Sequence, residues 1–166
     1  MTRARLIVAG SAAVVAGVVA AALPASASEP PPPNGAQEFA TGGFEDVACQ
    51  FGFDARRGPN GEVQGHLNQK CGEGSPRPFY ARGPVVCLDV QGNRAGFVWQ
   101  VQETSDQSFQ GLYEHFSVRD NGPPGQGVPD MVVSAPNTPV LPPSCPPITE
   151  TVPALKGNIV VHDSTP

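Results

Sequence analysis

The sequence predicts an all-β protein, a single antiparallel β-sandwich or small β-barrel of about six to eight strands. Apolar residues recur at every second position in several short segments, which is the period of a half-buried strand. The 166 residues include 20 prolines and 19 glycines, a density that interrupts long helices and favours short strands joined by turns. No segment has the apolar spacing of an amphipathic helix.

Residues 1–27 have the pattern of a secretory signal peptide. Two arginines lie within the first five residues, residues 6–23 carry no charge, and Ala25-x-Ala27 precedes an expected cleavage after Ala27. The alternative is a retained transmembrane anchor, which the Ala- and Gly-rich composition and the helix-breaking Pro24 disfavour. We therefore expect a secreted, extracellular protein with no stable membrane insertion after cleavage.

The remainder of the chain is acidic. Residues 1–27 hold two of the ten basic residues and none of the fifteen acids, so residues 28–166 carry a formal net charge of −7. This charge argues against nucleic acid and against electrostatic docking on anionic lipid. The charge does not identify a partner, which stays unknown; contact with the cell envelope is one possibility that the sequence leaves open. Residues 28–43 include four consecutive prolines and predict an extended spacer before a single β domain at 44–166.

A first hairpin is predicted between two alternating segments that flank residues 59–61. These three residues, Pro-Asn-Gly, suit a hairpin loop with its last glycine in the left-handed region. In the register that aligns the apolar faces of the two strands, the numbers of any two paired residues sum to 120. This register places Phe53 opposite Leu67. The same register places Cys49 opposite Cys71.

A second hairpin is predicted around a two-residue turn at 92–93. Partner numbers then sum to 185. Leu88 lies opposite Phe97 and Val86 opposite Trp99 in this register. Aliphatic–aromatic cross-strand pairs of this kind stabilise a sheet.

Three further strands are predicted at residues 112–120, 131–134 and 157–162. The last is expected to lie beside an early strand and so protect the edges of the sheet. Residues 121–129 and 136–147 are rich in glycine and proline and predict loops.

The four cysteines predict two disulfides. An even number of cysteines in an exported chain is typical of a disulfide framework, and four cysteines allow three pairings. The register of the first hairpin selects Cys49–Cys71, which leaves Cys87–Cys145. No Cys-x-x-Cys is present, so the sequence indicates neither a redox motif nor a zinc knuckle.

Glu114 is the one candidate site residue. It shares a predicted strand face with apolar residues, where it could bind a ligand inside a barrel or act as a general acid beside His115. It could equally mark a bulge or the end of a strand. Gly-x-Ser-x-Gly and His-Glu-x-x-His motifs are absent, so no catalytic residue is assigned, although a triad of distant residues stays open.

No metal and no cofactor are expected. The histidines at 66, 115 and 162 do not have metal-ligand spacing, and His66 and His115 fall on faces shared with polar residues, which suits exposed side chains. Asp120 and Asp130 could supply oxygens to calcium, but their loop lacks the order of an EF-hand. A turn in which Asp and Asn bond nearby backbone is the preferred interpretation.

Five short segments follow one another in an order that resembles a known group of proteins. They are CLDVQGNRA at 87–95, FSVRDNG at 116–122, Pro129-Asp130, Cys145 and GNIVVHD at 157–163. This order resembles small secreted actinobacterial proteins of unknown function. The resemblance implies secretion and carries over no catalytic residue. It also implies that Cys87 and Cys145 are the usual cysteines of the group and that Cys49 and Cys71 are an addition.

The preferred functional prediction is a secreted, disulfide-stabilised β domain without enzymatic activity, a component of the cell envelope or the medium. One alternative is a small-ligand-binding β-barrel with Glu114 inside, and another is a hydrolase. An enclosed, partly polar cavity would favour ligand binding. A histidine–acid pair facing a cleft would favour catalysis.

Overall fold

The protein is described by a computed structural model that covers residues 38–124, 127–149, 151–154 and 156–164. Within these ranges the chain forms ten strands and one short 3-10 helix, η2 (Gln107–Phe109). The strands are β1 (Glu38–Glu45), β2 (Cys49–Arg57), β3 (Val63–Cys71), β4 (Phe79–Gln91), β5 (Arg94–Gln100), β6 (Glu103–Thr104), β7 (Tyr113–Arg119), β8 (Met131–Ser134), β9 (Val152–Pro153) and β10 (Lys156–His162). The all-β prediction is confirmed, but the number of strands exceeds the predicted six to eight.

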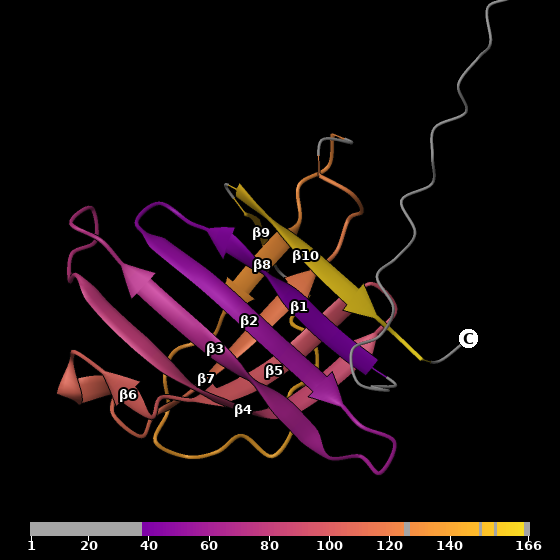
Figure 1. The fold of residues 1–166 in the computed structure, drawn as a ribbon, viewed down its shortest axis with the longest axis horizontal. Helices are drawn as coiled ribbons and strands as arrows, with labels where there is room; N and C mark the ends of the chain where they lie inside the picture. The colour runs from indigo at the N-terminus through magenta and orange to yellow at the C-terminus, as the bar shows by residue number, and fades with distance from the viewer. Residues whose placement is uncertain (1–37, 125–126, 150, 155, 165–166) are drawn as a thin grey trace, which may run out of the picture.

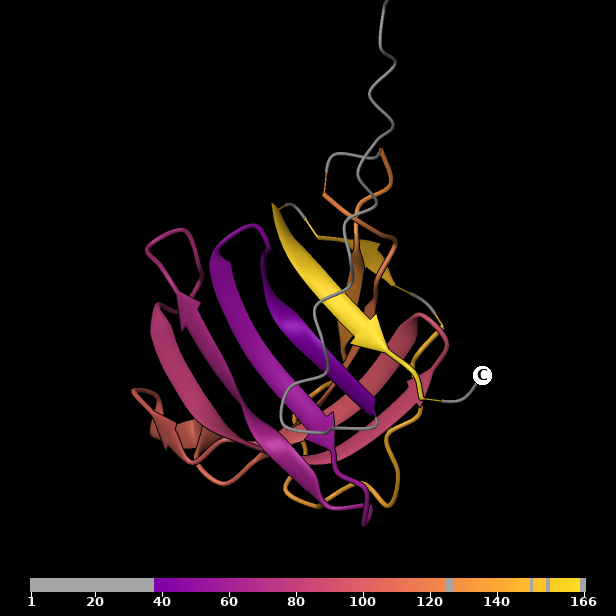
Figure 2. The ribbon, with the colours of Figure 1, turned by 45° about the vertical axis from the view of Figure 1, so that its right-hand side comes forward.

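The strands form one antiparallel sheet in the order β10-β1-β2-β3-β4-β5-β7-β8-β9, with β6 paired to β4. The sheet curls into a half-barrel whose two sides face each other (Figures 1 and 2). We call β10, β1, β2 and β3 the first layer, and β5, β7 and β8 the second. The long strand β4 pairs with both β3 and β5, and a β-bulge between Val85 and Cys87 lies where it passes from one layer to the other.

The first layer begins earlier than the sequence predicted. Residues 38–43 belong to β1 rather than to a spacer, and β1 pairs with β2 on one side and β10 on the other. A Cβ atom on Gly42, where φ is +154°, would lie 2.3 Å from the carbonyl oxygen of Asn158, so glycine is needed for β10 to approach. The rest of the predicted spacer, 28–37, and the predicted signal peptide, 1–27, lie outside the described residues.

The first hairpin has the predicted register. Phe53 pairs with Leu67 and Cys49 pairs with Cys71, and the latter two form a disulfide. Gly61 in the connecting loop has a φ of +83°, the left-handed conformation that a short hairpin loop requires. The terminal strand β10 lies beside β1, as the sequence predicted for an early strand.

The second hairpin differs from the prediction at its open end. Leu88 lies opposite Phe97 as expected, but Trp99 faces Val85 and not Val86. The β-bulge adds one residue to β4 at this point, so the side chain of Val85 enters the core. The strand also extends before the predicted start, and that part pairs with β3.

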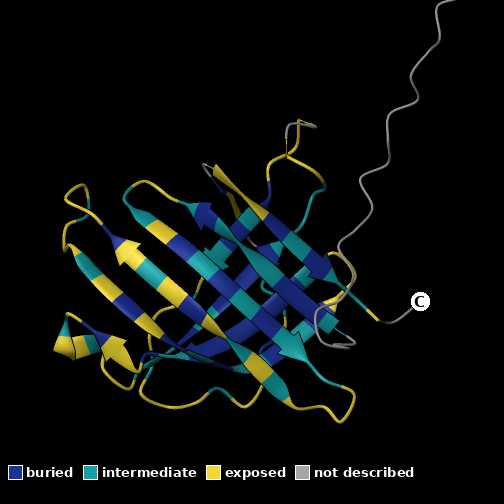
Figure 3. Ribbon diagram, in the orientation of Figure 1, coloured by how far each residue is buried: buried dark blue, intermediate teal, exposed yellow. Residues whose placement is uncertain are grey.

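Phenylalanine side chains from both layers meet in the core, where dark blue segments alternate along the strands in Figure 3. Phe53 of β2 stacks on Phe97 of β5 with ring centroids 5.0 Å apart, and Phe51 meets the edge of Phe116 of β7 at 5.6 Å. Burying an aromatic side chain of this size stabilises the fold by about 1.5–3 kcal/mol. These aromatic contacts hold the two sides of the half-barrel together.

A proline-rich segment, 135–148, covers the outer face of the second layer. The Ser117 hydroxyl of β7 accepts a hydrogen bond of 2.8 Å from the backbone of this segment. A Cβ atom on Gly96 of β5 would lie 2.2 Å from the carbonyl oxygen of Cys145, so the segment lies directly against the strand. The second disulfide, Cys87–Cys145, joins the segment to β4. Both the pairing of these cysteines and the loop around Cys145 were predicted from the sequence.

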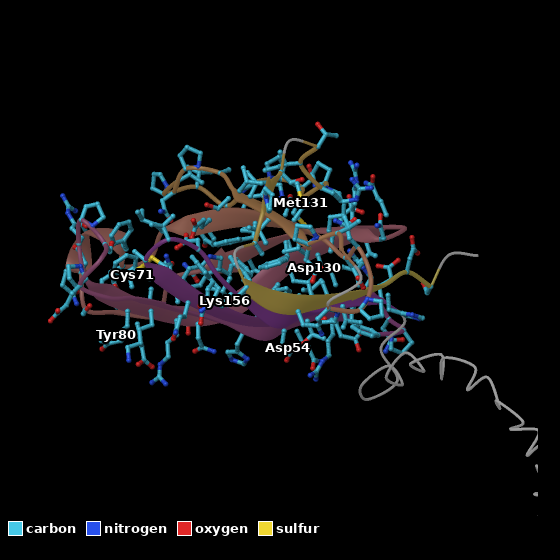
Figure 4. All side chains as sticks on the ribbon, turned by 90° about the horizontal axis from the view of Figure 1, so that it is seen from above. Asp54, Cys71, Tyr80, Asp130, Met131 and Lys156 are labelled. Atoms are coloured by element: carbon cyan, nitrogen blue, oxygen red, sulfur yellow. A yellow bond between two sulfur atoms is a disulfide. The ribbon has the colours of Figure 1, made fainter. Side chains whose placement is uncertain are left out.

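Two aspartates connect β10 to the second layer. The Asp130 carboxylate accepts a hydrogen bond of 2.7 Å from the Ile159 N–H, and the Asp120 carboxylate accepts one of 3.2 Å from the Val161 N–H. Each carboxylate also accepts a bond from the backbone of its own loop. Figure 4 shows Asp130 between the layers. The sequence predicted that these aspartates accept hydrogen bonds from nearby backbone. It did not predict their hydrogen bonds to β10.

Replacing Asp130 with asparagine is expected to lower the free energy of unfolding by about 1–3 kcal/mol. Both Asp130 oxygens accept backbone hydrogens, from Asn121 and from Ile159, and the side chain is 8% exposed. Asparagine offers one acceptor oxygen, so one of these N–H groups would face an amide NH₂. Urea denaturation of D130N beside the wild type measures the loss.

Asp46→Asn is the matched control for this prediction. Asp46 also accepts two backbone hydrogens, from Ala48 and Cys49, but through a single oxygen, Oδ1, and its side chain is exposed. An asparagine oxygen can replace that acceptor, so D46N is expected to change stability by less than about 0.5 kcal/mol. Equal losses in the two variants would contradict the role assigned to Asp130.

Candidate functional site

Glu114 lies inside the half-barrel. Side chains alternate along β7, so Glu114 points to the same face as Phe116 and Val118, into the core, and is 8% exposed. The indole Nε1 of Trp99 on β5 donates a hydrogen bond of 3.2 Å to Glu114 Oε2. The Ser134 side chain on β8 forms a further hydrogen bond with Glu114. Glu114 is therefore a buried acid with defined partners.

Burial raises the pKa of Glu114 to about 7. Loss of hydration disfavours the charged carboxylate and has the larger effect, whereas the hydrogen bonds from Ser134 and Trp99 favour the charged form and oppose it. Near neutral pH both the acid and the carboxylate are therefore populated. A ligand that prefers one form can shift this balance.

A hollow of about 150 Å³ lies beside Glu114. We call it the Glu114 hollow. It is lined by Gln69, Phe79, Ala81, Trp99, Val101, Phe109, Glu114 and Asn137. Glu114 is the one ionisable side chain among these residues. The rings of Phe79 and Phe109 stack with centroids 5.2 Å apart and form one wall. The hollow is thus mainly apolar with one acid and two amides. It is partly open to solvent, so it matches the lining of the cavity that the sequence analysis named but not its enclosure.

His115 does not join Glu114. It is the next residue along β7 and therefore points to the opposite, outer face of the sheet. There it is half-buried and interacts with the backbone of Cys145 and Pro146, and burial lowers its pKa. The prediction of an exposed His115 is wrong because the proline-rich segment covers this face. A general acid at Glu114 assisted by His115 is not supported by this geometry.

Neither of the other two histidines lines this hollow. His66 is exposed on β3, as predicted, and His162 on β10 stacks against Phe39. Among the residues that the structure describes, no cluster of three or more His, Cys, Asp or Glu side chains could hold a metal ion.

A second, wider hollow lies on the outer face of the first layer. It has a volume of about 420 Å³ and is lined by residues of β2, β3 and β4, including Asn68, Lys70 and the exposed Tyr80. Tyr80 and Asp54 project from this side in Figure 4. Its outline is shallow, and the polar side chains at alternate strand positions are those expected of any solvent-facing sheet.

The sequence identified Glu114 as a candidate site residue and Trp99 as a core residue, but it missed most of the hollow. Phe79 belongs to the part of β4 that was not predicted, and Phe109 belongs to η2. Gln69 follows from the register of the first hairpin, since it lies on the same strand face as Leu67. An acid on an otherwise apolar strand face was the signal for the site.

Comparison with known proteins gives no relative. No protein-family model matches the chain, and neither curated proteins nor solved structures give a match. Within the described residues, none of the helices has the length and apolar character needed to cross a membrane.

Proposed function

We propose that the chain is exported and that residues 28–166 act outside the cytoplasm as a non-enzymatic, disulfide-stabilised binding domain of the cell envelope or medium. The observation that carries the proposal is the pair of disulfides, Cys49–Cys71 and Cys87–Cys145, which uses all four cysteines of the chain. Structural disulfides persist in oxidising compartments and are rare in the cytosol.

Two further observations support this proposal. Residues 1–27 have the three-part pattern of a signal peptide. The interior acid Glu114 and its neighbour His115 point to opposite faces of β7, which removes the pair on which a hydrolase was considered. The proposed relationship to small secreted actinobacterial proteins is consistent with export and remains a prediction.

Small-ligand binding is the specific activity that the geometry favours for such a domain. The Glu114 hollow combines apolar walls with a few polar groups, as small-molecule sites commonly do. Its volume of about 150 Å³ restricts the ligand to a few heavy atoms.

Expression of the full chain in a bacterial host with a general secretory pathway tests export. We expect the exported protein to begin at Ser28, as read by N-terminal sequencing, with two disulfides in non-reducing peptide maps. Replacing Ala25 and Ala27 with leucine should block cleavage, because signal peptidase requires small residues there. A mature protein that retains residues 6–23, or one that stays in the cytoplasm, would refute the proposal.

A further inference from the structure

We propose that the Glu114 hollow binds a primary alkylammonium group, supplied by a free small amine or by a lysine side chain. The inference rests on the proposed binding role and adds the chemical class of the ligand. Three features of the hollow carry it: a carboxylate with acceptor capacity, aromatic walls and a volume that fits a short alkyl chain.

The carboxylate is held in place with room for another donor. Trp99 bonds Oε2 at 3.2 Å, and Ser134 supplies a second contact. An ionised carboxylate has about four lone-pair sites, so these two partners leave sites for the N–H groups of a ligand. An ammonium offers three donors and a charge of opposite sign, and its hydrogen bonds to a carboxylate are of the strong, charge-assisted kind.

The aromatic lining of the Glu114 hollow suits the alkyl chain of an alkylammonium ligand. Trp99, Phe79 and Phe109 present aromatic rings to the hollow, and aromatic rings attract cations as well as alkyl groups. The volume of about 150 Å³ is comparable to that of an apolar cavity that holds a benzene-sized molecule. A four-carbon ammonium, which is also the end of a lysine side chain, is of this size.

The charge balance of the hollow favours a cation. The residues around Glu114 are Gln69 from β3, Phe79 and Ala81 from β4, Trp99 from β5, Val101 directly after β5, Phe109 from η2, Ser134 from β8, and Asn137. None of these side chains carries a charge, so no cation from these residues neutralises Glu114. His115 lies on the other face of β7. The raised pKa of Glu114 agrees with a carboxylate that lacks such a partner, and a bound ammonium would stabilise its ionised form.

The single tryptophan of the chain makes the test specific. Trp99 is the only Trp, and its indole N–H bonds Glu114 directly. We expect n-butylammonium chloride at about pH 8 to shift the indole N–H resonance saturably and to change the Trp fluorescence. The neutral isostere n-butanol should shift the resonance at least about tenfold more weakly at equal concentration, because it lacks the charge.

Two variants of the oxidised, purified protein assign the effect to Glu114. Glu114→Gln should weaken n-butylammonium binding about tenfold or more. Glu73→Gln makes the same change of charge at an exposed position between β3 and β4 and should leave binding unchanged. Wild-type affinity should rise between about pH 5.5 and 8, and the affinity of E114Q should not.

A third variant covers the case in which E114Q does not fold. Ala81→Leu adds carbon atoms to the hollow while Glu114 remains, so it should abolish binding. Its melting temperature shows whether the fold is kept. Equal binding of n-butanol and n-butylammonium, or unchanged binding by E114Q, would overturn the proposal.

Nα-acetyl-lysine methylamide distinguishes the two sources of the ammonium group. Binding of this probe supports a lysine side chain, whereas binding of n-butylammonium alone supports a free amine. A chain that binds an amine but is not exported refutes only the proposed function. An exported chain that binds neither probe refutes only this inference.

Discussion

Replacing both Cys87 and Cys145 with alanine is expected to lower the free energy of unfolding by roughly 4 kcal/mol in the loop-entropy model. The bridge spans 58 residues of sequence, so its loss gives the unfolded chain a large gain in conformational freedom. It also joins β4 to segment 135–148, whose remaining contacts with the second layer include the bond to Ser117. Urea denaturation at constant pH measures the change.

The Cys49→Ala/Cys71→Ala variant is the matched comparison for that experiment. This bridge spans 22 residues, and the same model gives a loss of roughly 3 kcal/mol. The nine-residue ladder between β2 and β3 keeps these strands aligned without it. Hydrogen exchange at the Ile148 amide, which donates to Ser117 Oγ, should accelerate only in the Cys87/Cys145 variant. Acceleration in both variants would show that segment 135–148 does not depend on its own disulfide.

The parts of the fold that could be predicted from the sequence are those governed by local rules. The Pro-Asn-Gly loop fixes the register of the first hairpin, and from that register the Cys49–Cys71 pair follows. The two-residue turn at 92–93 likewise fixes the inner pairs of the second hairpin, such as Leu88 with Phe97.

The parts that could not be predicted depend on distant contacts. Gly42 interrupts the alternation of β1, yet it is the residue that lets β10 approach, since a Cβ there would meet Asn158. The β-bulge that moves Val85 into the core appears only when β4 must pair with two strands in different layers. The sequences of β1 and β4 alone predict neither the close approach at Gly42 nor the bulge at Val85.

The candidate site shows the same division. An acid on an apolar strand face marked Glu114 as unusual, and the alternation of β5 placed Trp99 in the core. The aromatic wall of Phe79 and Phe109 joins residues thirty positions apart, in a strand extension and a 3-10 turn. This wall forms because of the path that the chain takes between β4 and β7. No alternation of apolar residues in the sequence predicts that path.

The buried acid is also expected to make stability depend on pH. Glu114 has a pKa of about 7 in the folded protein, raised by burial from the ordinary glutamate value of 4.5. Below about pH 4.5 both states hold the proton, and Glu114 then causes no change with pH. As the pH rises toward 7, the unfolded chain releases the proton while the folded chain retains it, so stability falls. Above about pH 7 the accumulated loss is on the order of 3 kcal/mol, since one pKa unit corresponds to about 1.4 kcal/mol.

Glu114→Gln isolates this contribution, because glutamine has nearly the same size and cannot ionise. The free energy of unfolding of the wild type minus that of E114Q should fall by on the order of 3 kcal/mol between about pH 4 and pH 8.5. His115 titrates in both proteins and cancels in the difference, although its lowered pKa alone would make stability fall toward acid pH. The same difference for Glu73→Gln should stay within about 0.5 kcal/mol over this range. A flat difference for E114Q would mean that solvent reaches the Glu114 carboxylate and that the hollow is hydrated, because desolvation is the main cause of the raised pKa of Glu114.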